Sequence, residues 1–283
     1  MELLGRFWWW PVVLVLVHFG NKESDCCEWE GVKCNITTGR VIQLTLNWMV
    51  SRSEESGGGR YFNASYFLPF KDLQYLDLSS NLISGWIPNE GFDKFSALSK
   101  LEVLHLDYNN FNNSVLSSLS RIPSLKELYL GSNNFNGSIP FQGFESLSLL
   151  SKLEVLHMDA NDFNNSILSS LSGIASLKEL DLSNNNLNGS IHIQEFKAFS
   201  NLEDLYLNGN EINDFSKTKD SNILSKLQLL DLSQTKISAR ILESLVAFPS
   251  LKTLYLAYNN LEGPFTNKAS IPSRAAQLDS SLP

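Results

Sequence analysis

The nine residues LEVLHLDYN, Leu101–Asn109, decide the fold of this chain. Leucines at positions 101, 104 and 106 precede an asparagine at 109, which gives the pattern L-x-x-L-x-L-x-x-N. By subtraction, copies of this pattern start 24 to 28 residues apart, at Leu73, Leu125, Leu153, Leu177, Leu202, Leu227 and Leu251. A pattern that returns at a near-constant period indicates a chain built from stacked copies of one structural unit.

Each copy is expected to be a short strand with one buried face, followed by a turn. Residues two apart in a strand share a face, so Leu104 and Leu106 point inward while His105 and Asp107 point outward. The asparagine lies where the chain turns, and its amide can both donate to and accept from backbone groups. These asparagines are Asn81, Asn109, Asn133, Asn161, Asn185, Asn210 and Asn259. The seventh copy has Thr235 instead, which predicts a weaker turn.

Repeats of this length and pattern are typical of leucine-rich repeats. One copy cannot bury its own apolar face, so neighbouring copies must stack into a continuous core. We therefore predict an α/β-type leucine-rich repeat solenoid: a right-handed superhelix with a parallel β ladder on its concave face. Short 3₁₀ or second-strand segments are expected on the convex side, with buried phenylalanines between them: Phe92, Phe95, Phe144, Phe196, Phe199 and Phe248.

Two motifs resemble plant extracellular leucine-rich repeat proteins. The first is G-x-I-P after the asparagine, at Gly85–Pro88 and Gly137–Pro140 and partially at Gly189–Ile191 and Gly263–Phe265. In that class it marks a second short strand. The second, C-C-x-W-x-G-V-x-C before a T-G-R-V strand, resembles the N-terminal cap of plant leucine-rich repeat receptors and covers Cys26–Cys34.

The resemblance, which covers roughly residues 25–265, implies a disulfide between Cys27 and Cys34. In the family, the first cysteine of the pair bonds a cysteine further upstream, and this chain has none there. Cys26 is therefore expected to be an unpaired thiol, because an odd cysteine in a secreted chain signals a free thiol or an intermolecular bond.

The expected domain organisation has four parts. Residues 1–20 are predicted to be a signal peptide, since Phe7–Phe19 is apolar but too short to span a bilayer. The alternative is a mis-predicted start codon or exon. Residues 21–40 form an incomplete cap, 41–265 hold a first strand and about eight full repeats, and 266–283 form a disordered polar tail.

Composition narrows the function classes. The net charge of −8 disfavours nucleic acid as a partner. The cysteines and histidines show no metal-ligand spacing, so we expect neither a metal nor a cofactor. A flat ladder offers no water-excluding pocket and no oxyanion hole, and we therefore predict that the chain is not an enzyme.

Function is expected on the outward strand positions. Carboxylates alternate there with tyrosines, which favours recognition of a ligand carrying Lys or Arg. The predicted ligand-binding residues are Tyr75, Asp77, His105, Asp107, Tyr108, Tyr129, His157, Asp159, Asp181, Tyr206, Asp231, Tyr255 and Tyr258, with Glu127, Glu179 and Asp204 beside them. The alternative is a solvated polar face with no ligand of its own.

The resemblance implies an extracellular receptor-like module that binds a peptide or protein ligand in plant defence or developmental signalling. It would be secreted or lie on the extracellular face of the plasma membrane. No stretch of the sequence is long and apolar enough for a transmembrane span. The chain lacks a kinase, so a co-receptor kinase is an expected partner. Six N-x-S/T sequons fit this route, at Asn35, Asn63, Asn112, Asn136, Asn164 and Asn188.

Two other functions stay open. One is a soluble inhibitor of microbial cell-wall-degrading enzymes, similar to polygalacturonase inhibitors, which share the cap and the G-x-I-P repeats. The other is a truncated, non-functional receptor fragment.

Overall fold

The computed structural model describes residues 25–49, 60–137, 146–216, 223–238, 248–259 and 261. The predicted signal peptide and the predicted polar tail lie outside these residues. The chain divides into two compact units, Met1–Asn134 (unit 1) and Phe135–Pro283 (unit 2).

The ladder of unit 1 is built from β1 (Val32–Cys34), β2 (Val41–Thr45), β4 (Tyr75–Asp77), β6 (Val103–His105) and β7 (Glu127–Tyr129), in that order. β1 and β2 are antiparallel, whereas the later pairs are parallel. The strand register aligns equivalent positions of neighbouring repeats, since Leu76 pairs with Leu44 on one side and with Leu104 on the other. Stacking identical positions puts every central leucine on the same buried face.

Unit 2 repeats this arrangement with β8 (Val155–His157), β9 (Glu179–Asp181), β11 (Asp204–Tyr206), β13 (Leu229–Asp231) and β14 (Thr253–Tyr255). All four pairs are parallel. Leu205 is paired with Leu180 and Leu230, and both partners are fully buried. The predicted parallel ladder of leucine-rich repeats is therefore confirmed.

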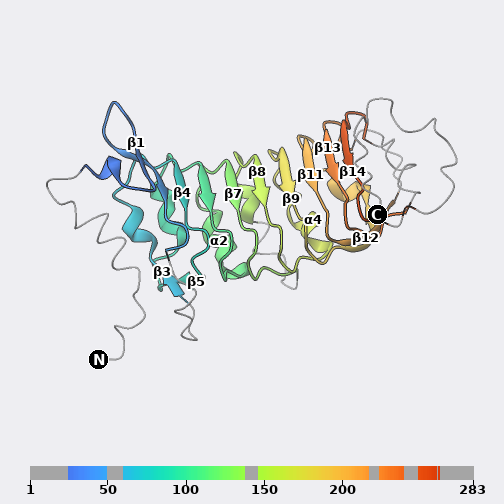
Figure 1. Ribbon diagram of the computed structural model, residues 1–283, viewed down its shortest axis with the longest axis horizontal. Helices are drawn as coiled ribbons and strands as arrows, with labels where there is room; N and C mark the ends of the chain where they lie inside the picture. The colour runs from blue at the N-terminus through green and yellow to red at the C-terminus, as the bar shows by residue number, and fades with distance from the viewer. Residues whose placement is uncertain are drawn as a thin grey trace. The chain divides into compact units, whose positions relative to one another are not determined.

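The opposite side of each unit carries short segments. In unit 1 these are η4 (Ala64–Phe67), η5 (Phe92–Ala97), η6 (Asn113–Val115) and α2 (Leu116–Leu119), with β3 (Arg60–Phe62) paired to β5 (Ile83–Trp86). In unit 2 they are η7 (Ser146–Leu149), α4 (Ser166–Ser170) and η8 (Ile193–Phe196), with β10 (Asn188–His192) paired to β12 (Glu211–Ser216). Figure 1 shows β3 and β5 away from β4, and α4 and β12 on the far side of their ladder.

The second strands follow the G-x-I-P signal in part. β5 contains Gly85 and β10 contains Gly189, as the motif predicts. β12 forms without the motif, because its Ile212 and Phe215 are buried beside β10 and fix the register. Where the glycine is absent, after Asn109 and Asn161, the chain forms 3₁₀ and α-helical turns instead.

Phenylalanines fill the core under these segments. Phe62, Phe92 and Phe95 are mutually in contact, with ring centroids 5.2–5.9 Å apart. The fully buried set is Phe62, Phe67, Phe92, Phe95, Phe111, Phe135, Phe163, Phe196, Phe199, Phe215 and Phe248. The predicted core role of Phe92, Phe95, Phe196, Phe199 and Phe248 is confirmed, while Phe144 lies outside the described residues.

The repeat asparagines hold the turns. The amide nitrogen of Asn109 donates to the carbonyls of Leu78 and Leu106 at 3.0 Å. Its carbonyl oxygen accepts from the backbone amides of Asn81 at 3.2 Å and Ile83 at 2.9 Å. One side chain thus satisfies backbone groups in two successive repeats, which would otherwise be buried without partners.

The residue before each repeat asparagine, and before Thr235 in the seventh repeat, adopts a left-handed backbone conformation. The set comprises Ser80, Tyr108, Ser132, Ala160, Asn184, Gly209, Gln234 and Tyr258, with φ between 48° and 69°. Only one member is glycine, and the other side chains carry a conformational cost of about 1 kcal/mol each. The asparagine bonds and the stacked neighbours maintain this turn against that cost.

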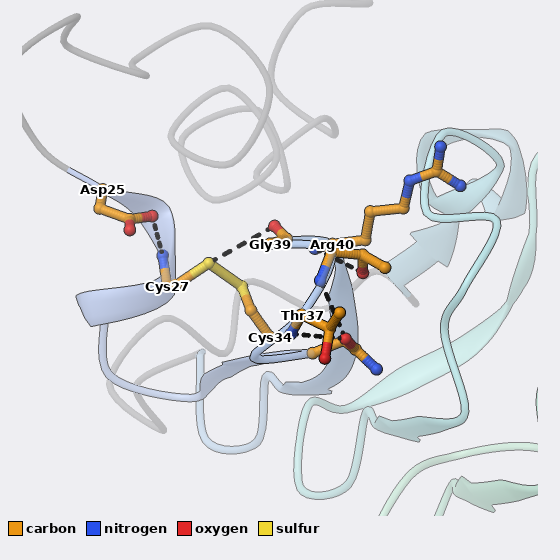
Figure 2. Close-up of a disulfide and its surroundings, with 8 residues drawn as sticks. Asp25, Cys27, Cys34, Thr37, Gly39 and Arg40 are labelled. Carbon is orange, nitrogen blue, oxygen red and sulfur yellow. Dashed lines mark hydrogen bonds between the residues drawn. A yellow bond between two sulfur atoms is a disulfide. The ribbon is translucent and has the colours of Figure 1, made fainter.

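The cap lies at the N-terminal end of the ladder of unit 1, where a disulfide holds it against the first strand. Cys27 and Cys34 form a disulfide that joins η2 (Cys26–Glu28) to β1. Figure 2 shows this bond beside Gly39, whose carbonyl oxygen lies 3.7 Å from Cys27 Sγ. The Asp25 carboxylate accepts from the Cys27 amide at 3.0 Å and so begins the 3₁₀ turn. Cys26 is free and half-buried.

Candidate ligand-binding face

The outward side of the ladder is a repeating three-residue pattern. In each strand of either ladder from β4 to β14, the middle residue is a buried leucine and its two neighbours point out of the sheet. We call these outward side chains, together with the residues of the turn that follows each strand, the ladder face of each unit. Every predicted ligand-binding residue lies on it.

The ladder face of unit 1 carries a row of rings. His105 stacks on Tyr129 with centroids 4.0 Å apart and planes 5° apart. On the other side, His105 lies 5.3 Å from the ring of Tyr75. The pKa of Tyr75 is raised, first by burial and then by the nearby carboxylates Asp77 and Asp107. The three rings form an ordered aromatic surface.

Carboxylates border this row. Asp107 Oδ2 lies 3.3 Å from His105 Nδ1, and Asp107 Oδ1 accepts from the Gly131 amide at 3.0 Å. The Tyr129 hydroxyl donates to Glu127 at 2.9 Å. The side chains are therefore held in place before any ligand arrives, which lowers the entropy lost on binding.

Three aspartates of the face occur in the sequence D-L-S. Asp77, Asp181 and Asp231 each accept, through Oδ1, from the backbone amide two residues later at 2.8 Å. Asp77 is only 7% exposed, so little of its carboxylate is accessible to a ligand. Asp77 stabilises its own turn, and it is the one buried side chain among the predicted binding residues.

The ladder face of unit 2 is more acidic. Asp204 has a raised pKa because of burial and the nearby charges of Glu179 and Glu203. Burial, followed by the charges of Glu179, Asp204 and Asp181, raises the pKa of Tyr206 to about 12. Both pKa shifts arise first from burial and then from neighbouring carboxylates, and both effects make a further negative charge at these positions unfavourable.

His157 is held differently from its duplicated counterpart His105. Its Nε2 lies 2.9 Å from Glu179 Oε1 on the next strand. His157 also belongs to a cluster with Asp159 and Asp181, in which one potential ligand atom from each residue lies within 4.8 Å of the others.

Two tyrosines stand out from the turns. Tyr108 in unit 1 is 63% exposed and Tyr258 in unit 2 is 67% exposed. Both adopt the left-handed conformation that precedes the repeat asparagine, which directs the ring away from the core. They are the most accessible aromatic groups among the predicted binding residues.

Basic side chains are kept off the strands. None of the residues of β4, β6, β7, β8, β9, β11, β13 and β14 is Lys or Arg. Lysines directly precede β7, β9 and β14: Lys126 pairs with Glu102 and Lys178 with Glu154 at 2.9 Å, and Lys252 donates to Gln228 Oε1 at 2.6 Å. The ladder faces of both units therefore present a negative potential to a ligand.

All six sequon asparagines are among the described residues, where Asn188 begins β10 and Asn136 forms an isolated β-bridge with Asp162. Asn112, Asn164 and Asn188 are exposed, and Asn35, Asn63 and Asn136 are half-buried. Asn112 and Asn164 each accept from the backbone amide two residues on through Oδ1, which leaves the amide nitrogen, the glycosylation atom, outside that bond. None of the six lies on a ladder strand.

Family comparison agrees with this architecture. A leucine-rich repeat model matches residues 72–92, 124–147 and 176–198, and a second leucine-rich repeat model matches residues 200–261. The chain is 40% identical over 243 residues to Cuscuta receptor 1 of Solanum lycopersicum, which covers 75% of this chain and 21% of that protein. It is 32% identical over 266 residues to Receptor-like protein 13 of Arabidopsis thaliana, an alignment that covers 90% of this chain and 19% of that protein.

This chain is a leucine-rich repeat protein related to plant receptor-like proteins. The leucine-rich repeat chain spans about a fifth of the length of these two relatives. Among solved structures it is similar to the PEPR1–AtPEP1 complex, with a TM-score of 0.53 and 28% identity over 89% of this chain and 36% of that one. No helix in the described residues of the leucine-rich repeat chain is long and apolar enough to cross a bilayer.

Sequence reasoning missed the contacts between neighbouring strands. The His105–Tyr129 stack and the His157–Glu179 hydrogen bond join residues 24 and 22 positions apart. The only signal in the sequence was that these residues occupy outward positions of consecutive copies. Position in the repeat identifies neighbours, but it does not tell which side chains contact each other.

Proposed function

We propose that this chain is an extracellular, receptor-like recognition module that binds a peptide or protein ligand carrying Lys or Arg side chains. The single observation that carries the proposal is the composition of the ladder faces. They combine carboxylates with tyrosines and have no Lys or Arg on the strands from β4 to β14. Such a surface attracts basic groups at long range and supplies large contact areas at low entropic cost.

The tyrosines provide the contact area. Tyr108 and Tyr258 are exposed, whereas Tyr75, Tyr129 and Tyr206 are half-buried and held by neighbours. Rigid aromatic side chains lose little freedom when they are covered. The similarity to plant receptor-like proteins and to a PEPR1–AtPEP1 structure supports the same class of function. Defence or developmental signalling through a co-receptor kinase, and glycosylation at the six sequons during secretion, belong to this proposal.

A binding assay with charge-matched peptide pools tests the proposal. The full chain is immobilised, and two pools of random synthetic peptides are passed over it. One pool carries Lys and Arg at fixed positions, and the other carries Asp and Glu at the same positions. Selective retention of the basic pool is expected, and it should weaken as salt screens the charges.

Matched variants locate the binding surface. Asp204→Asn with Asp231→Asn removes two charges from the ladder face of unit 2 while keeping the side-chain shape, and should reduce retention. Glu102→Gln with Glu154→Gln removes two carboxylates that pair with lysines beside the strands, and should change it little. Equal retention of both pools, or equal loss in both double variants, would contradict the proposal. Capture of a fungal polygalacturonase in place of basic peptides would favour the inhibitor alternative.

A further inference from the structure

The cluster of His157, Asp159 and Asp181 has the donor set of a metal site. One potential ligand atom from each residue lies within 4.8 Å of the other two. His157 and Asp159 come from β8 and the residues just after it, and Asp181 ends the neighbouring strand β9. We propose that these three side chains bind a divalent transition-metal ion, for which Zn²⁺ is the natural probe.

The second observation is the orientation of the imidazole. His157 Nε2 lies 2.9 Å from Glu179 Oε1. A neutral imidazole that donates from Nε2 keeps its lone pair on Nδ1, which is then the ligand atom. Histidine ligands of metals commonly donate their other ring nitrogen to a carboxylate, which fixes the tautomer and makes the ligand more basic. Glu179 is therefore a positioning residue rather than a metal ligand.

The histidine of unit 1 shows which ring nitrogen faces the following aspartate. His105 Nδ1 lies 3.3 Å from Asp107 Oδ2, across the same two-residue spacing that separates His157 from Asp159. Both copies read as a histidine, a buried hydrophobe and an aspartate. In unit 1, Nδ1 therefore lies on the side of the aspartate two residues later, and the same spacing in unit 2 is compatible with Nδ1 of His157 as the ligand atom.

One substitution distinguishes the two copies. The position occupied by Asp181 in unit 2 is occupied by Tyr129 in unit 1, where the ring stacks on His105. The Tyr129 hydroxyl also donates to Glu127, the counterpart of Glu179. Unit 1 therefore has two of the three donors and a ring in place of the third. It is an internal control for the site in unit 2.

Charge and geometry both favour a cation in unit 2. Asp181 uses Oδ1 to accept from the Ser183 amide at 2.8 Å, so the carboxylate is oriented and Oδ2 is not part of that bond. Nitrogen and carboxylate ligands bind Zn²⁺ at about 2.0–2.2 Å, so two ligand atoms on one ion are at most about 4.4 Å apart and the side chains must rotate toward one another on binding. Calcium prefers oxygen ligands and more of them, so it should bind weakly. Spacing along the chain does not predict this site, because Asp181 reaches it from the next repeat.

Calorimetric titration of the full chain with Zn²⁺ tests the inference, with Ca²⁺ and Mg²⁺ run in parallel. The background variant carries Cys26→Ser, so that the free thiol cannot bind zinc. One Zn²⁺ per chain is expected. Asp181→Asn, which can keep the bond from the Ser183 amide, should abolish it. Glu179→Gln should weaken it by about 10- to 100-fold, as other losses of a supporting carboxylate do.

Asp231→Asn is the matched control, since Asp231 makes the same turn bond at 2.8 Å in the same D-L-S sequence. It should leave zinc affinity unchanged. Tyr129→Asp supplies the third carboxylate in unit 1 and should add a second equivalent of zinc. Circular dichroism establishes that each variant is folded.

Absence of zinc binding by the parent chain would overturn the inference, and so would equal binding by folded Asp181→Asn. A folded Tyr129→Asp chain that takes up no second equivalent would contradict the assignment of the third ligand. The titration uses no peptide ligand, so its outcome is independent of the proposed recognition function.

Discussion

Thr235 Oγ1 donates to Asn259 Oδ1 over 2.7 Å, at the one turn where threonine replaces the repeat asparagine. The same oxygen of Asn259 accepts from the backbone amides of Thr235 and Ile237 at 3.2 Å. Thr235 also donates to the Leu232 carbonyl at 2.8 Å. A hydroxyl has one proton to donate, so these two bonds compete, whereas an amide group has two.

Replacing Thr235 with asparagine should therefore stabilise the chain. The new side chain can donate to Leu232 and to the preceding turn, as Asn210 does when it donates to Leu182 and Leu207 at 2.9 Å. A net gain of about 1 kcal/mol is expected. Thermal unfolding followed by circular dichroism measures it. Thr235→Val is the control and should destabilise, because it removes the donor from a buried position.

Replacing Asn109 with alanine should destabilise unit 1 strongly. The change leaves the buried amides of Asn81 and Ile83 and the carbonyls of Leu78 and Leu106 without this partner. A loss of roughly 2–4 kcal/mol is expected, since unsatisfied buried polar groups each cost 1–3 kcal/mol.

Asn110→Ala is the control for that change. Asn110 is exposed, and only its backbone amide is bonded, to the Ile83 carbonyl at 2.8 Å. Urea unfolding of both variants should show a large shift for position 109 and almost none for position 110. Similar shifts would mean that the asparagine network does not determine stability.

Glycine at position 209 is favoured for two reasons. Its φ of +69° is unfavourable for a residue with a side chain, and a Cβ there would collide with Oδ1 of Asn184. Gly189 has a similar φ of +65° but no atom within 4 Å of the Cβ position. Gly189→Ala should cost about 1 kcal/mol from conformation alone, and Gly209→Ala should cost more. Equal unfolding midpoints for the two variants would show that the contact with Asn184 is relieved without cost.

Tyr206 should titrate far above an ordinary tyrosine. Its pKa is raised from 10.0 to about 12 by burial and then by Glu179, Asp204 and Asp181. Because the folded value is the higher one, its contribution to stability is fully present below pH 10 and is lost as the pH rises through about 12. Tyrosinate absorbance of the chain minus that of Tyr206→Phe isolates this group. Glu179→Gln should lower the pKa, and an unchanged value would exclude the proposed charge effect.

Cys26 should be the one thiol that reacts in the native chain under non-reducing conditions. Cys27 and Cys34 are joined, and Cys26 is free and half-buried. Alkylation followed by peptide mass mapping should label position 26 and recover the Cys27–Cys34 crosslink. Complete absence of labelling in a monomer that unfolds normally would show that Cys26 has a different partner.

The repeat pattern was sufficient to predict the ladder and its core. Leu76, Leu104 and Leu128 are in register because every copy places leucine at the same phase. The period of two along a strand then separates buried from outward residues without further information. The role of the buried asparagines followed from the same pattern, because a polar residue at a buried turn must satisfy backbone groups.

The motifs on the opposite side were less informative. Gly85 and Gly189 marked second strands, but β12 formed without that signal. Its pairing with β10 depends on buried Ile212 and Phe215, and many short apolar segments share that composition. Local sequence therefore does not distinguish a second strand from a 3₁₀ turn on this side of the ladder.

The sequence by itself determined which residues point outward, because side-chain direction depends only on position in the repeat. The tertiary structure decided what those residues do. Asp77 accepts a hydrogen bond from the Ser79 amide in its own turn, and His105 stacks on Tyr129. His157 lies within hydrogen-bond distance of Glu179 and in a cluster with two aspartates. The physical reason is that the Asp77 contact depends on a side-chain rotamer, and the histidine contacts also depend on neighbours from another repeat, neither of which the pattern within one repeat contains.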